Sequence, residues 1–354
     1  MVNYFRQQHW YVGVVHLHDR TQLDADYDAM AQMCDHLLVY HPADEELAGR
    51  RNGQLDQWCP AAFATTVANL CRQQQISVVI VQFVFLTRCF VTLGSESRIF
   101  KILDADNVFT NRAELYWSAG LNYDWFSTDA DQERRALQRA DLIIGIQENE
   151  VARIRDMAEG KPVMLVPHVR EVVDAATPDN CNMLFVGAAN EENLSGLRKF
   201  IQSALPKIVA AHPEARLLVA GRVGEHLDAH PAIERLGVVP HLLDCYTRAA
   251  IVINTTECGT GLKIKTVDAL CHGKCLVSTP AGVEGLERYP NRYFTAASTA
   301  EFAQRILWLS RNRPQIAATG RQAFDFARSY FNPAIVLGEL ERKILRSKPA
   351  NESA

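Results

Sequence analysis

The stretch IVINTTECGTGLKIKTVDALCHGKCLVSTPAGVEGL, residues 251–286, decides the fold of this chain. Its first part, Ile251–Asn254, is a short apolar run with β-branched side chains, which predicts a buried strand. Gly259-Thr260-Gly261 predicts a tight turn that a ligand approaches closely, because glycine leaves its backbone uncovered. From Leu262 onward apolar residues recur at helical spacing, and Lys274–Thr279 predicts a second strand. The stretch therefore reads as strand, glycine turn, helix and strand.

This turn has the chemistry of a phosphate site. Open α/β sheets bind ligands outside the carboxyl ends of their strands, and a helix start offers N–H groups and a positive dipole end. Lys263 and Lys265 place two cations in the first helical turn, where a cation is unfavourable without an anion to bind. Asp268, further along the helix, suits the vicinal hydroxyls of a ribose. The residues predict a site for a nucleoside diphosphate that carries a sugar; the alternative is an ordinary βαβ unit with surface lysines.

Composition narrows the class of protein. The 354 residues are enough for two α/β domains, and the net charge of −4 gives no support for nucleic acid as a partner. Nine scattered cysteines without a C-x-x-C pair predict reduced thiols. The start, Met1–His9, is polar, and the longest apolar run, Ile76–Leu86, is too short to span a bilayer. We expect a cytoplasmic protein, at most peripheral to the inner face of the membrane.

The stretch resembles the donor site of retaining GT-B glycosyltransferases of family four, the "glycosyl transferases group 1" type. Residues 259–265 match the motif G-x-G-[IL]-K-[IL]-K, and residues 273–286 match G-K-x-[LV]-V-[SA]-T-x-x-G-x-E-G-L. The family's Glu-x7-Glu signature is altered here. Asp268 stands at the position of the second Glu, and Thr260 stands at the position of the first.

The resemblance implies an α/β protein with the GT-B fold: two Rossmann-like parallel α/β domains facing a central cleft, and a C-terminal helix that returns to the first domain. A polar segment at 168–180 has the composition of a linker. We therefore expect an acceptor domain at 1–170, a donor domain at 171–332, and a crossover helix with a polar tail at 333–354. Apolar runs predict their strands at Tyr11–Leu17, Leu37–Tyr40, Ile76–Leu86, Arg98–Leu103, Asp141–Gln147, Lys161–Pro167, Met183–Val186, Arg216–Ala220, Leu236–Val239, Ile251–Asn254, Lys274–Thr279 and Arg292–Thr295.

Other turns of the second domain complete the expected donor site. Gly187 follows a strand and precedes a helix, which again suits a phosphate. Arg222 is a candidate for the diphosphate by resemblance, and the alternative is a surface arginine. The resemblance also places the nucleotide base beside the backbone near Val239. The expected donor-binding residues are Gly187, Arg222, Val239, Gly259, Thr260, Gly261, Leu262 and Asp268.

The expected catalytic residues are Lys263, Lys265, Asp104 and Asp106. The segment from Asp104 to Arg112 resembles the family's D-T-H-D-V-F-x-x-R, with Asp106 at the position of the His. The resemblance implies that no bound metal is required, so we expect neither a metal nor another cofactor. His16 and His18 share a face of a predicted strand, and we favour local hydrogen bonding there over a metal because the sequence offers no third ligand.

An aromatic segment, Phe109–Phe126, has two interpretations. It is either a loop packed on the core by its own rings or a platform for the acceptor, because flat rings stack on sugar faces. Arg112, Trp117 and Trp125 are the acceptor candidates. The acceptor classes that fit are a glycan, a lipid-linked sugar and a small molecule.

The predicted function is transfer of a sugar from a nucleotide-diphosphate donor to an acceptor hydroxyl, in glycan or glycoconjugate biosynthesis. The resemblance implies retention of the anomeric configuration and closure of the two domains around the substrates. Two alternatives stay open. One is a non-catalytic GT-B protein that binds a nucleotide sugar or supports a partner, which the departures at Thr260 and Asp106 suggest. The other is a nucleotide-sugar epimerase on the same scaffold.

Overall fold

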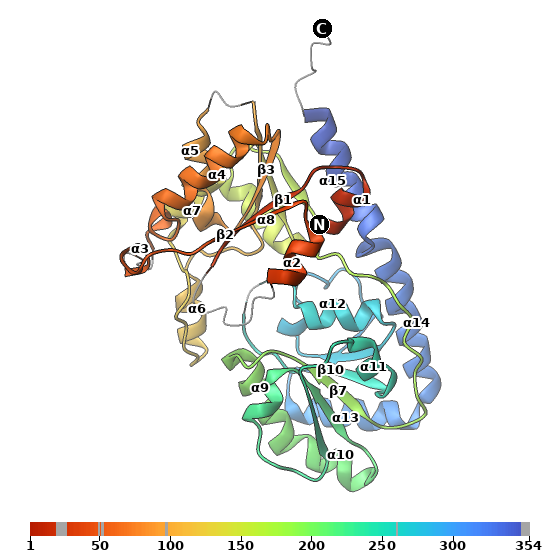
Figure 1. Cartoon of the computed structure of the whole chain (residues 1–354). Coiled ribbons are helices and arrows are strands. Elements are labelled where there is room, and N and C mark those ends of the chain that lie inside the picture. Colours follow the sequence, from red (N-terminus) through yellow and green to blue (C-terminus); the bar gives the residue numbers. More distant parts are fainter. Residues whose placement is uncertain (19–26, 49, 51–52, 96–97, 260, 348–354) are drawn as a thin grey trace. The chain divides into compact units, whose positions relative to one another are not determined.

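The computed structural model describes residues 1–18, 27–48, 50, 53–95, 98–259 and 261–347, and the chain divides into two compact units (Figure 1). The first unit comprises Met1–Ala113, Asp124–Val166 and Pro333–Ala354, and the second comprises Glu114–Tyr123 and Pro167–Asn332. None of the helices in the described ranges combines the length and apolar character that crossing a bilayer requires.

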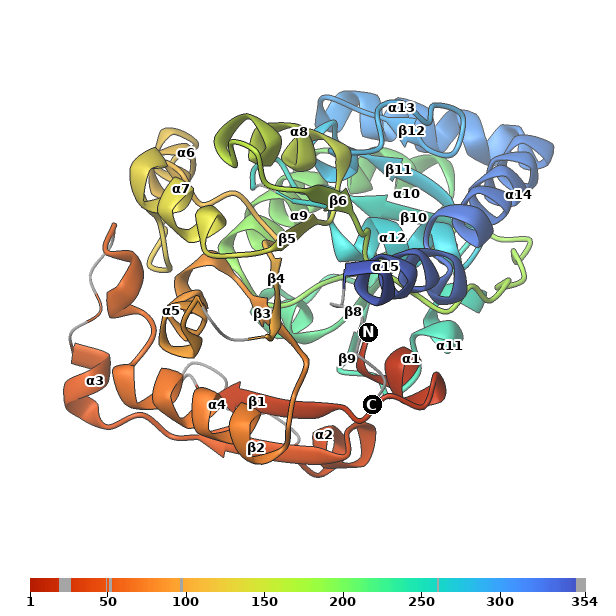
Figure 2. The ribbon, with the colours of Figure 1, turned by 90° about the horizontal axis from the view of Figure 1, so that it is seen from above.

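Two parallel sheets form the first unit. One has the order β3-β4-β5-β6, and the other pairs β1 with β2, which lie side by side in Figure 2. The strands are β1 (Gly13–Leu17), β2 (His36–Tyr40), β3 (Val78–Gln82), β4 (Phe100–Asp104), β5 (Leu142–Gly145) and β6 (Val163–Leu165). All six strands that the sequence predicted for this part of the chain are present.

The predicted strand Ile76–Leu86 is wrong at its carboxyl end. β3 stops at Gln82, Phe83 has φ +68°, and residues 84–86 form a 3-10 turn. The apolar side chains after the break pack around one another: the ring of Phe85 lies 5.2 Å from that of Phe83 and 5.0 Å from that of Phe126. An apolar run that looks like one long strand is therefore a strand followed by part of an aromatic core.

The last helix belongs to the first unit. Glu341, on α15 (Pro333–Ser347), accepts hydrogen bonds from Trp10 Nε1 at 2.6 Å and from Tyr4 Oη at 3.0 Å. The other helices of this unit are α1 (Val2–Gln7), α2 (Tyr27–Met33), α3 (Asp44–Ala48), α4 (Ala61–Gln73), α5 (Arg88–Leu93), α7 (Ala130–Gln138) and α8 (Glu148–Met157). The C-terminal helix thus packs with the N-terminal part of the chain, as the sequence predicted.

The second unit has one six-stranded parallel sheet. Its order is β12-β11-β10-β7-β8-β9, so the strand order reverses between β7 and β10. The strands are β7 (Met183–Val186), β8 (Leu217–Ala220), β9 (Ile233–Gly237), β10 (Ile251–Asn254), β11 (Cys275–Ser278) and β12 (Phe294–Thr295). Numbered within the unit, this is the 3-2-1-4-5-6 order of dinucleotide-binding folds, whose ligands lie outside the carboxyl ends at the reversal.

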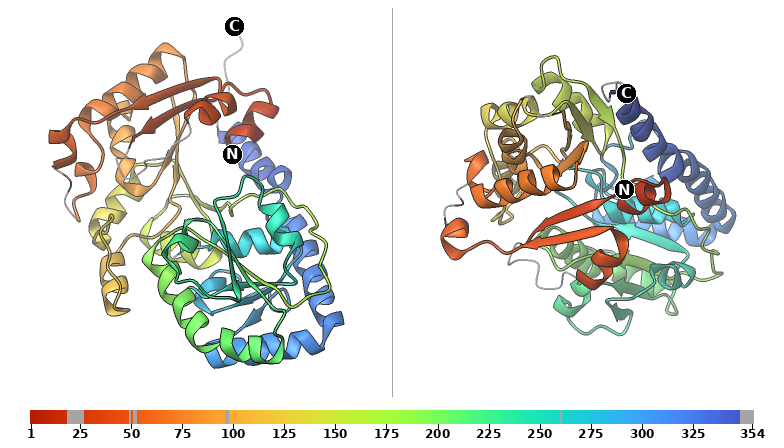
Figure 3. Two further views of the ribbon diagram at one scale, coloured as in Figure 1. Left: turned by 60° about the horizontal axis from the view of Figure 1, so that its bottom comes forward. Right: turned by 45° about the horizontal axis from the view of Figure 1, so that its top comes forward.

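Helices cover both faces of this sheet (Figure 3). Met183 and Phe185 of β7 belong to a core shared with α9, α10 and α13, whereas Leu184 belongs to a core shared with α11 and α12. The alternation follows from the two-residue period of a strand and explains why the central strands are apolar throughout. The helices are α9 (Glu191–Ser203), α10 (Leu205–Ala211), α11 (Leu242–Thr247), α12 (Ile264–Cys271), α13 (Thr299–Arg311) and α14 (Arg313–Tyr330).

The boundary between the units differs from the sequence prediction. Residues 167–170 belong to the second unit, because the amide of Arg170 donates to the carbonyl of Phe331 and its side chain reaches Asp268. Segment 114–123 also belongs to the second unit. It includes most of α6 (Arg112–Ser118), and Tyr116 of α6 donates a hydrogen bond to Glu192. Composition does not indicate that segment 114–123 belongs to the second unit, because its contacts there join residues that are distant in sequence.

Candidate functional site

The glycine turn after β10 lies at the point where the strand order reverses. Gly259 has φ +108° and Gly261 has φ +83°, which are backbone conformations that residues with a side chain rarely adopt. Thr260, between them, lies outside the described residues. On the other side of the reversal, a Cβ on Gly196 of α9 would lie 1.9 Å from the carbonyl oxygen of Thr255. The strand end and α9 therefore touch through backbone, and the two glycines have the positive φ values that a tight turn uses.

Lys265 is held in one place by protein oxygens and an aromatic ring. Its Nζ donates to Asn193 Oδ1 and, at 3.1 Å, to Thr256 Oγ1, and it lies 4.8 Å from the centre of the Phe185 ring. Burial, helped by the nearby Lys263 and opposed by Glu192, lowers the pKa of Lys265 to about 8. The ammonium is thus a fixed, partly desolvated cation beside the turn, and not a surface lysine.

Lys263 closes the turn itself. Its Nζ donates to the carbonyl oxygens of Gly259 at 3.1 Å and Gly261 at 2.9 Å, and Glu284 Oε2 lies 4.0 Å away. The same residue is the N-cap of α12, and its side chain makes no capping bond to the helix. The first turn of α12 therefore carries cations where most helices carry a capping acceptor.

Asp268 is buried on α12, and its Oδ1 accepts from Arg170 Nε at 2.8 Å. The sequence did not identify Arg170, which is 98 residues away and lies in the segment that joins the units. The buried ring of Tyr246 stacks on His272, one turn further along α12, at 4.2 Å between centroids. The ribose-binding role of Asp268 stays a prediction, and the carboxylate has an ion-pair partner of its own.

Gly187 is brought next to Lys265 through Asn193. A Cβ on Gly187 would lie 3.0 Å from Asn193 Nδ2, and this amide nitrogen donates to the carbonyl of Ala188 at 2.9 Å. The amide oxygen of Asn193 accepts from Lys265, so one buried side chain connects the two glycine turns. Sequence reasoning missed this role of Asn193, although its place after a strand and a glycine was a signal.

The remaining candidate donor-binding residues have less definite contacts. Leu262 is buried beneath the turn. Arg222 is exposed at the start of the 3-10 turn 222–226, and Val239 is half-buried after β9. Their predicted roles toward the diphosphate and the base stay predictions.

Two carboxylates lie at the carboxyl end of β4 in the first unit: Asp104 is its last residue, and Asp106 follows. Burial, together with the negative charge of Asp106, raises the pKa of Asp104 to about 7. Asp106 has φ +57° and accepts a hydrogen bond from Asn107 Nδ2 at 2.9 Å. A carboxyl group that titrates near neutrality can hold or release a proton, which is the property a catalytic acid or base needs.

The aromatic segment separates into core and surface. Trp125 packs on Phe83 and Phe109, with ring centroids 5.4 and 5.5 Å apart, and the buried guanidinium of Arg112 lies 5.3 Å from the Phe109 ring centre. Trp117, in contrast, is 55% exposed. Packing favours the core interpretation for Trp125 and Arg112, whereas Trp117 keeps the exposure that a platform requires.

The histidine pair of β1 and its end makes contacts with neighbouring rings. His18 Nδ1 bonds the hydroxyl of Tyr27, and the His41 ring lies 4.8 Å from that of His18. The ring of His16 contacts the ring of Tyr27 at 5.8 Å. The hydrogen bond of His18 agrees with the local hydrogen bonding that we favoured, whereas His16 makes a ring contact.

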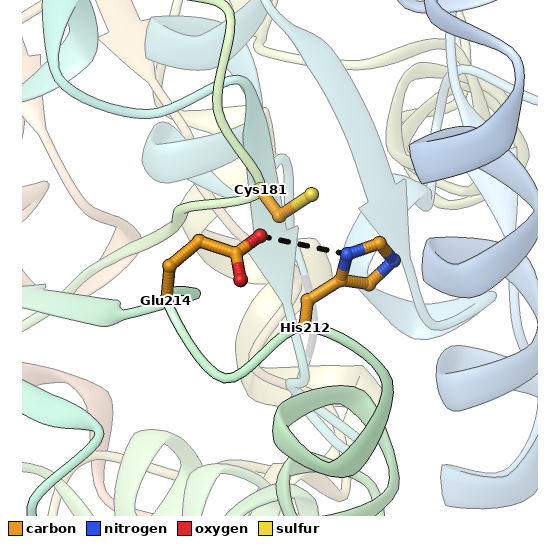
Figure 4. A group of neighbouring side chains, drawn as sticks. All are labelled: Cys181, His212 and Glu214. Atoms are coloured by element: carbon orange, nitrogen blue, oxygen red, sulfur yellow. Dashed lines mark ion pairs between the residues drawn. The ribbon is translucent and has the colours of Figure 1, made fainter.

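Cys181, His212 and Glu214 form a small cluster before the amino end of β7 (Figure 4). His212 Nδ1 lies 3.6 Å from Glu214 Oε1. Burial raises the pKa of the Cys181 thiol, and Arg313 Nη2 lies 3.3 Å from its sulfur. A protonated thiol beside a guanidinium opposes a further cation, so we assign no metal to this cluster.

Comparison with solved structures defines the fold class. Sucrose-phosphate synthase from Thermosynechococcus elongatus superposes with a TM-score of 0.73 at 14% identity, over 98% of this chain and 92% of that one. Anabaena HepE in complex with UDP and glucose gives 0.70 at 13%, over 98% and 94%, and a glycosyltransferase from Rickettsia africae gives 0.68 at 11%, over 98% and 93%. The protein has the GT-B fold.

Sequence comparison covers part of the chain. Residues 180–312 match the family described as "Glycosyl transferases group 1". A Klebsiella pneumoniae protein, "Uncharacterized 44.6 kDa protein in cps region", is 26% identical over 200 residues. The match covers 51% of this chain and about half, 52%, of that relative.

Proposed function

We propose that this protein is a glycosyltransferase that moves a sugar from a nucleoside-diphosphate donor to an acceptor hydroxyl. One observation carries the proposal: the Lys265 ammonium is fixed by Asn193 and Thr256 at the reversal of the strand order, beside the Gly259 turn. Such a cation, next to a helix start and a glycine turn, suits a diphosphate. The family of residues 180–312 and the UDP and UDP-glucose complexes of HepE support the same reading.

The proposed chemistry follows from where charge develops. When the bond between sugar and diphosphate breaks, negative charge grows on the leaving diphosphate. Lys265, Lys263 and the first N–H groups of α12 would stabilise that charge, and they are already in place, so no reorganisation is needed at the moment of reaction. We propose retention of the anomeric configuration and no requirement for a metal, both on the resemblance of the sequence to family four.

The proposed substrates are a nucleotide-diphosphate sugar and a glycan, lipid-linked or small-molecule acceptor. HepE was solved with UDP-glucose, and the pneumococcal O-GlcNAc transferase GtfA, a further similar structure at 11% identity, was solved with UDP and GlcNAc. These complexes make UDP-sugars the first donors to test. We further propose that the protein works in glycan biosynthesis in the cytoplasm, at most peripherally on a membrane.

A non-catalytic role is the second candidate, and two positions favour it. Asp106 stands where the family motif has His, and Thr260 stands where it has Glu. One experiment separates the candidates: incubation with a panel of UDP-, GDP-, ADP- and TDP-sugars, followed by product analysis. Transfer or slow hydrolysis of one donor supports the transferase, an epimerised sugar indicates an epimerase, and binding without any product indicates the non-catalytic protein. A chain that neither binds nor converts any nucleotide sugar contradicts the proposed function.

A further inference from the structure

A phenol and a carboxylate converge on the glycine turn of the donor site. The hydroxyl of Tyr116 donates to Glu192 Oε1, although the two residues are 76 positions apart. A Cβ on Gly259 would lie 3.0 Å from Tyr116 Oη and 3.4 Å from both the carboxyl carbon and Oε1 of Glu192. A side chain at position 259 would crowd this pair, and φ of +108° also disfavours one, so the pair and the glycine lie in direct contact.

The contacts of Glu192 exceed what the start of a helix needs. Glu191 and Glu192 both lie in the first turn of α9, where a carboxylate complements the helix dipole. Asn190 already caps this helix, because its side chain accepts from the amide of Asn193 at 3.0 Å. Glu191 is exposed, whereas Glu192 is half-buried and directed at the turn by Tyr116. The two neighbours share the dipole role, and Glu192 in addition bonds Tyr116 at the site.

A carboxylate beside a diphosphate site needs an explanation, because it repels the phosphates. Its charge instead suits hydroxyl groups, which donate to a carboxylate in strong, charge-assisted hydrogen bonds. In a nucleotide-diphosphate sugar the group beyond the phosphates is an uncharged ring with several hydroxyls. The tyrosine oxygen adds a further polar atom at the same place. The chemistry of this pair therefore matches the sugar of the donor better than its phosphates.

We propose that Glu192, oriented by Tyr116, accepts hydrogen bonds from hydroxyls of the donor sugar and thereby selects which sugar is transferred. This inference rests on the proposed function. The proposed carboxylate comes from α9. At position 260 the family motif has Glu, and this chain has Thr. Tyr116 acts as the positioning residue, because its hydroxyl holds one carboxylate oxygen.

The test compares Glu192→Gln with the matched control Glu191→Gln, using calorimetry with UDP and UDP-glucose as probes. If the wild type prefers another nucleotide sugar, that sugar and its own nucleoside diphosphate replace the two probes. Glu192→Gln should weaken the binding of UDP-glucose relative to that of UDP about tenfold, which is about 1.4 kcal/mol. The affinity for UDP should stay constant or increase, because a like charge has been removed. Glu191→Gln should change both affinities by less than about twofold.

Tyr116→Phe gives an independent measurement. It removes the hydroxyl and keeps the ring that packs on Tyr123 at 4.7 Å, so the fold should persist. It should weaken the binding of UDP-glucose relative to that of UDP by about threefold, which is less than the effect of Glu192→Gln. The ratio of kcat/KM for UDP-glucose and UDP-galactose, which differ in the orientation of one hydroxyl, should move toward one in both variants.

The outcomes separate this inference from the proposed function. If Glu192→Gln weakens UDP and UDP-glucose equally, or changes neither, Glu192 does not contact the sugar and the inference is overturned. If Glu191→Gln has the same effect as Glu192→Gln, both carboxylates act only through the helix dipole, which also overturns it. If the wild type binds no nucleoside diphosphate at all, the proposed function itself fails.

Discussion

Two helices, α9 and α12, start at the same edge of the second unit's sheet with opposite chemistry. α9 begins after β7 with the cap Asn190 and two carboxylates, which satisfy its N–H groups and its dipole within the protein. α12 begins after β10 with Lys263 as its N-cap and Lys265 in its first turn, and the Lys263 side chain makes no capping bond. This difference indicates where the phosphates bind: the cap and the acidic residues at the start of α9 oppose an anion, whereas the lysines at the start of α12 attract one.

The largest expected effect comes from removing the fixed cation at α12. Lys265→Ala should lower turnover by one to three orders of magnitude, roughly the scale of losing one preorganised contact to developing charge. Initial rates with saturating donor measure the change. Lys207→Ala, which removes an exposed lysine from α10, is the control and should keep wild-type rates. Equal rates for all three proteins would remove the distinction between the two helix starts.

Asp268→Asn should have the next largest effect, because it takes the charge from the predicted ribose acceptor on α12. Binding of nucleoside diphosphate should weaken by about 1.5–3 kcal/mol, the range for hydrogen bonds to a charged group. Calorimetry with a 2′,3′-dideoxy analogue separates the causes, since that ligand should bind both proteins alike.

Arg170→Gln is the control for Asp268, because it breaks the ion pair and leaves the carboxylate in place. It should change the melting temperature more than the affinity. If Asp268→Asn weakens the nucleotide and its dideoxy analogue equally, the ribose contact is wrong and the carboxylate serves Arg170.

The pH dependence of binding should reveal the buried cation directly. Burial lowers the pKa of Lys265 to about 8, so the side chain loses its proton as pH rises through that value. A diphosphate prefers the ammonium, so Kd for UDP should rise by up to about tenfold per pH unit above 8. Lys265→Arg should show a flat profile between pH 7.5 and 9.5, because a guanidinium stays charged. A falling Kd in the wild type would contradict the assignment.

The same shift has a consequence of opposite sign for stability. The unfolded chain keeps the lysine proton to a higher pH than the folded protein does, so the folded state gains stability as pH rises above 8. Below pH 8 the cost of burying the charge is fully present. Binding and stability should therefore respond to pH in opposite directions, and denaturant titrations at pH 7.5 and 9.5 measure the second.

The smallest effect tests α9 alone. Asn190→Ala removes a cap and should lower the free energy of unfolding by about 1 kcal/mol, as is typical of such caps. Affinity for nucleoside diphosphate should stay within about twofold, because the cap serves the helix and not the ligand. A loss of binding without a loss of stability would mean that α9, too, is a phosphate site.

Local patterns predicted the fold well, because each strand and glycine turn is recorded in adjacent residues. Ile251–Asn254 became β10, and the turn at Gly259 appeared where the glycines stand. Contacts between distant residues could not be read from the sequence. The pairs Asn193–Lys265 and Arg170–Asp268 join positions 72 and 98 apart, and no local period marks them. The same limit hid which tryptophan of the aromatic segment is exposed.

The most direct test of the central claim is calorimetric titration of the wild type and of Lys265→Ala with UDP, GDP, ADP and TDP. We expect at least one nucleoside diphosphate to bind the wild type with one-to-one stoichiometry. This ligand should raise the melting temperature by mass action, and Lys265→Ala should bind it at least tenfold more weakly. Full binding by Lys265→Ala, or no binding of any of the four by the wild type, would contradict it.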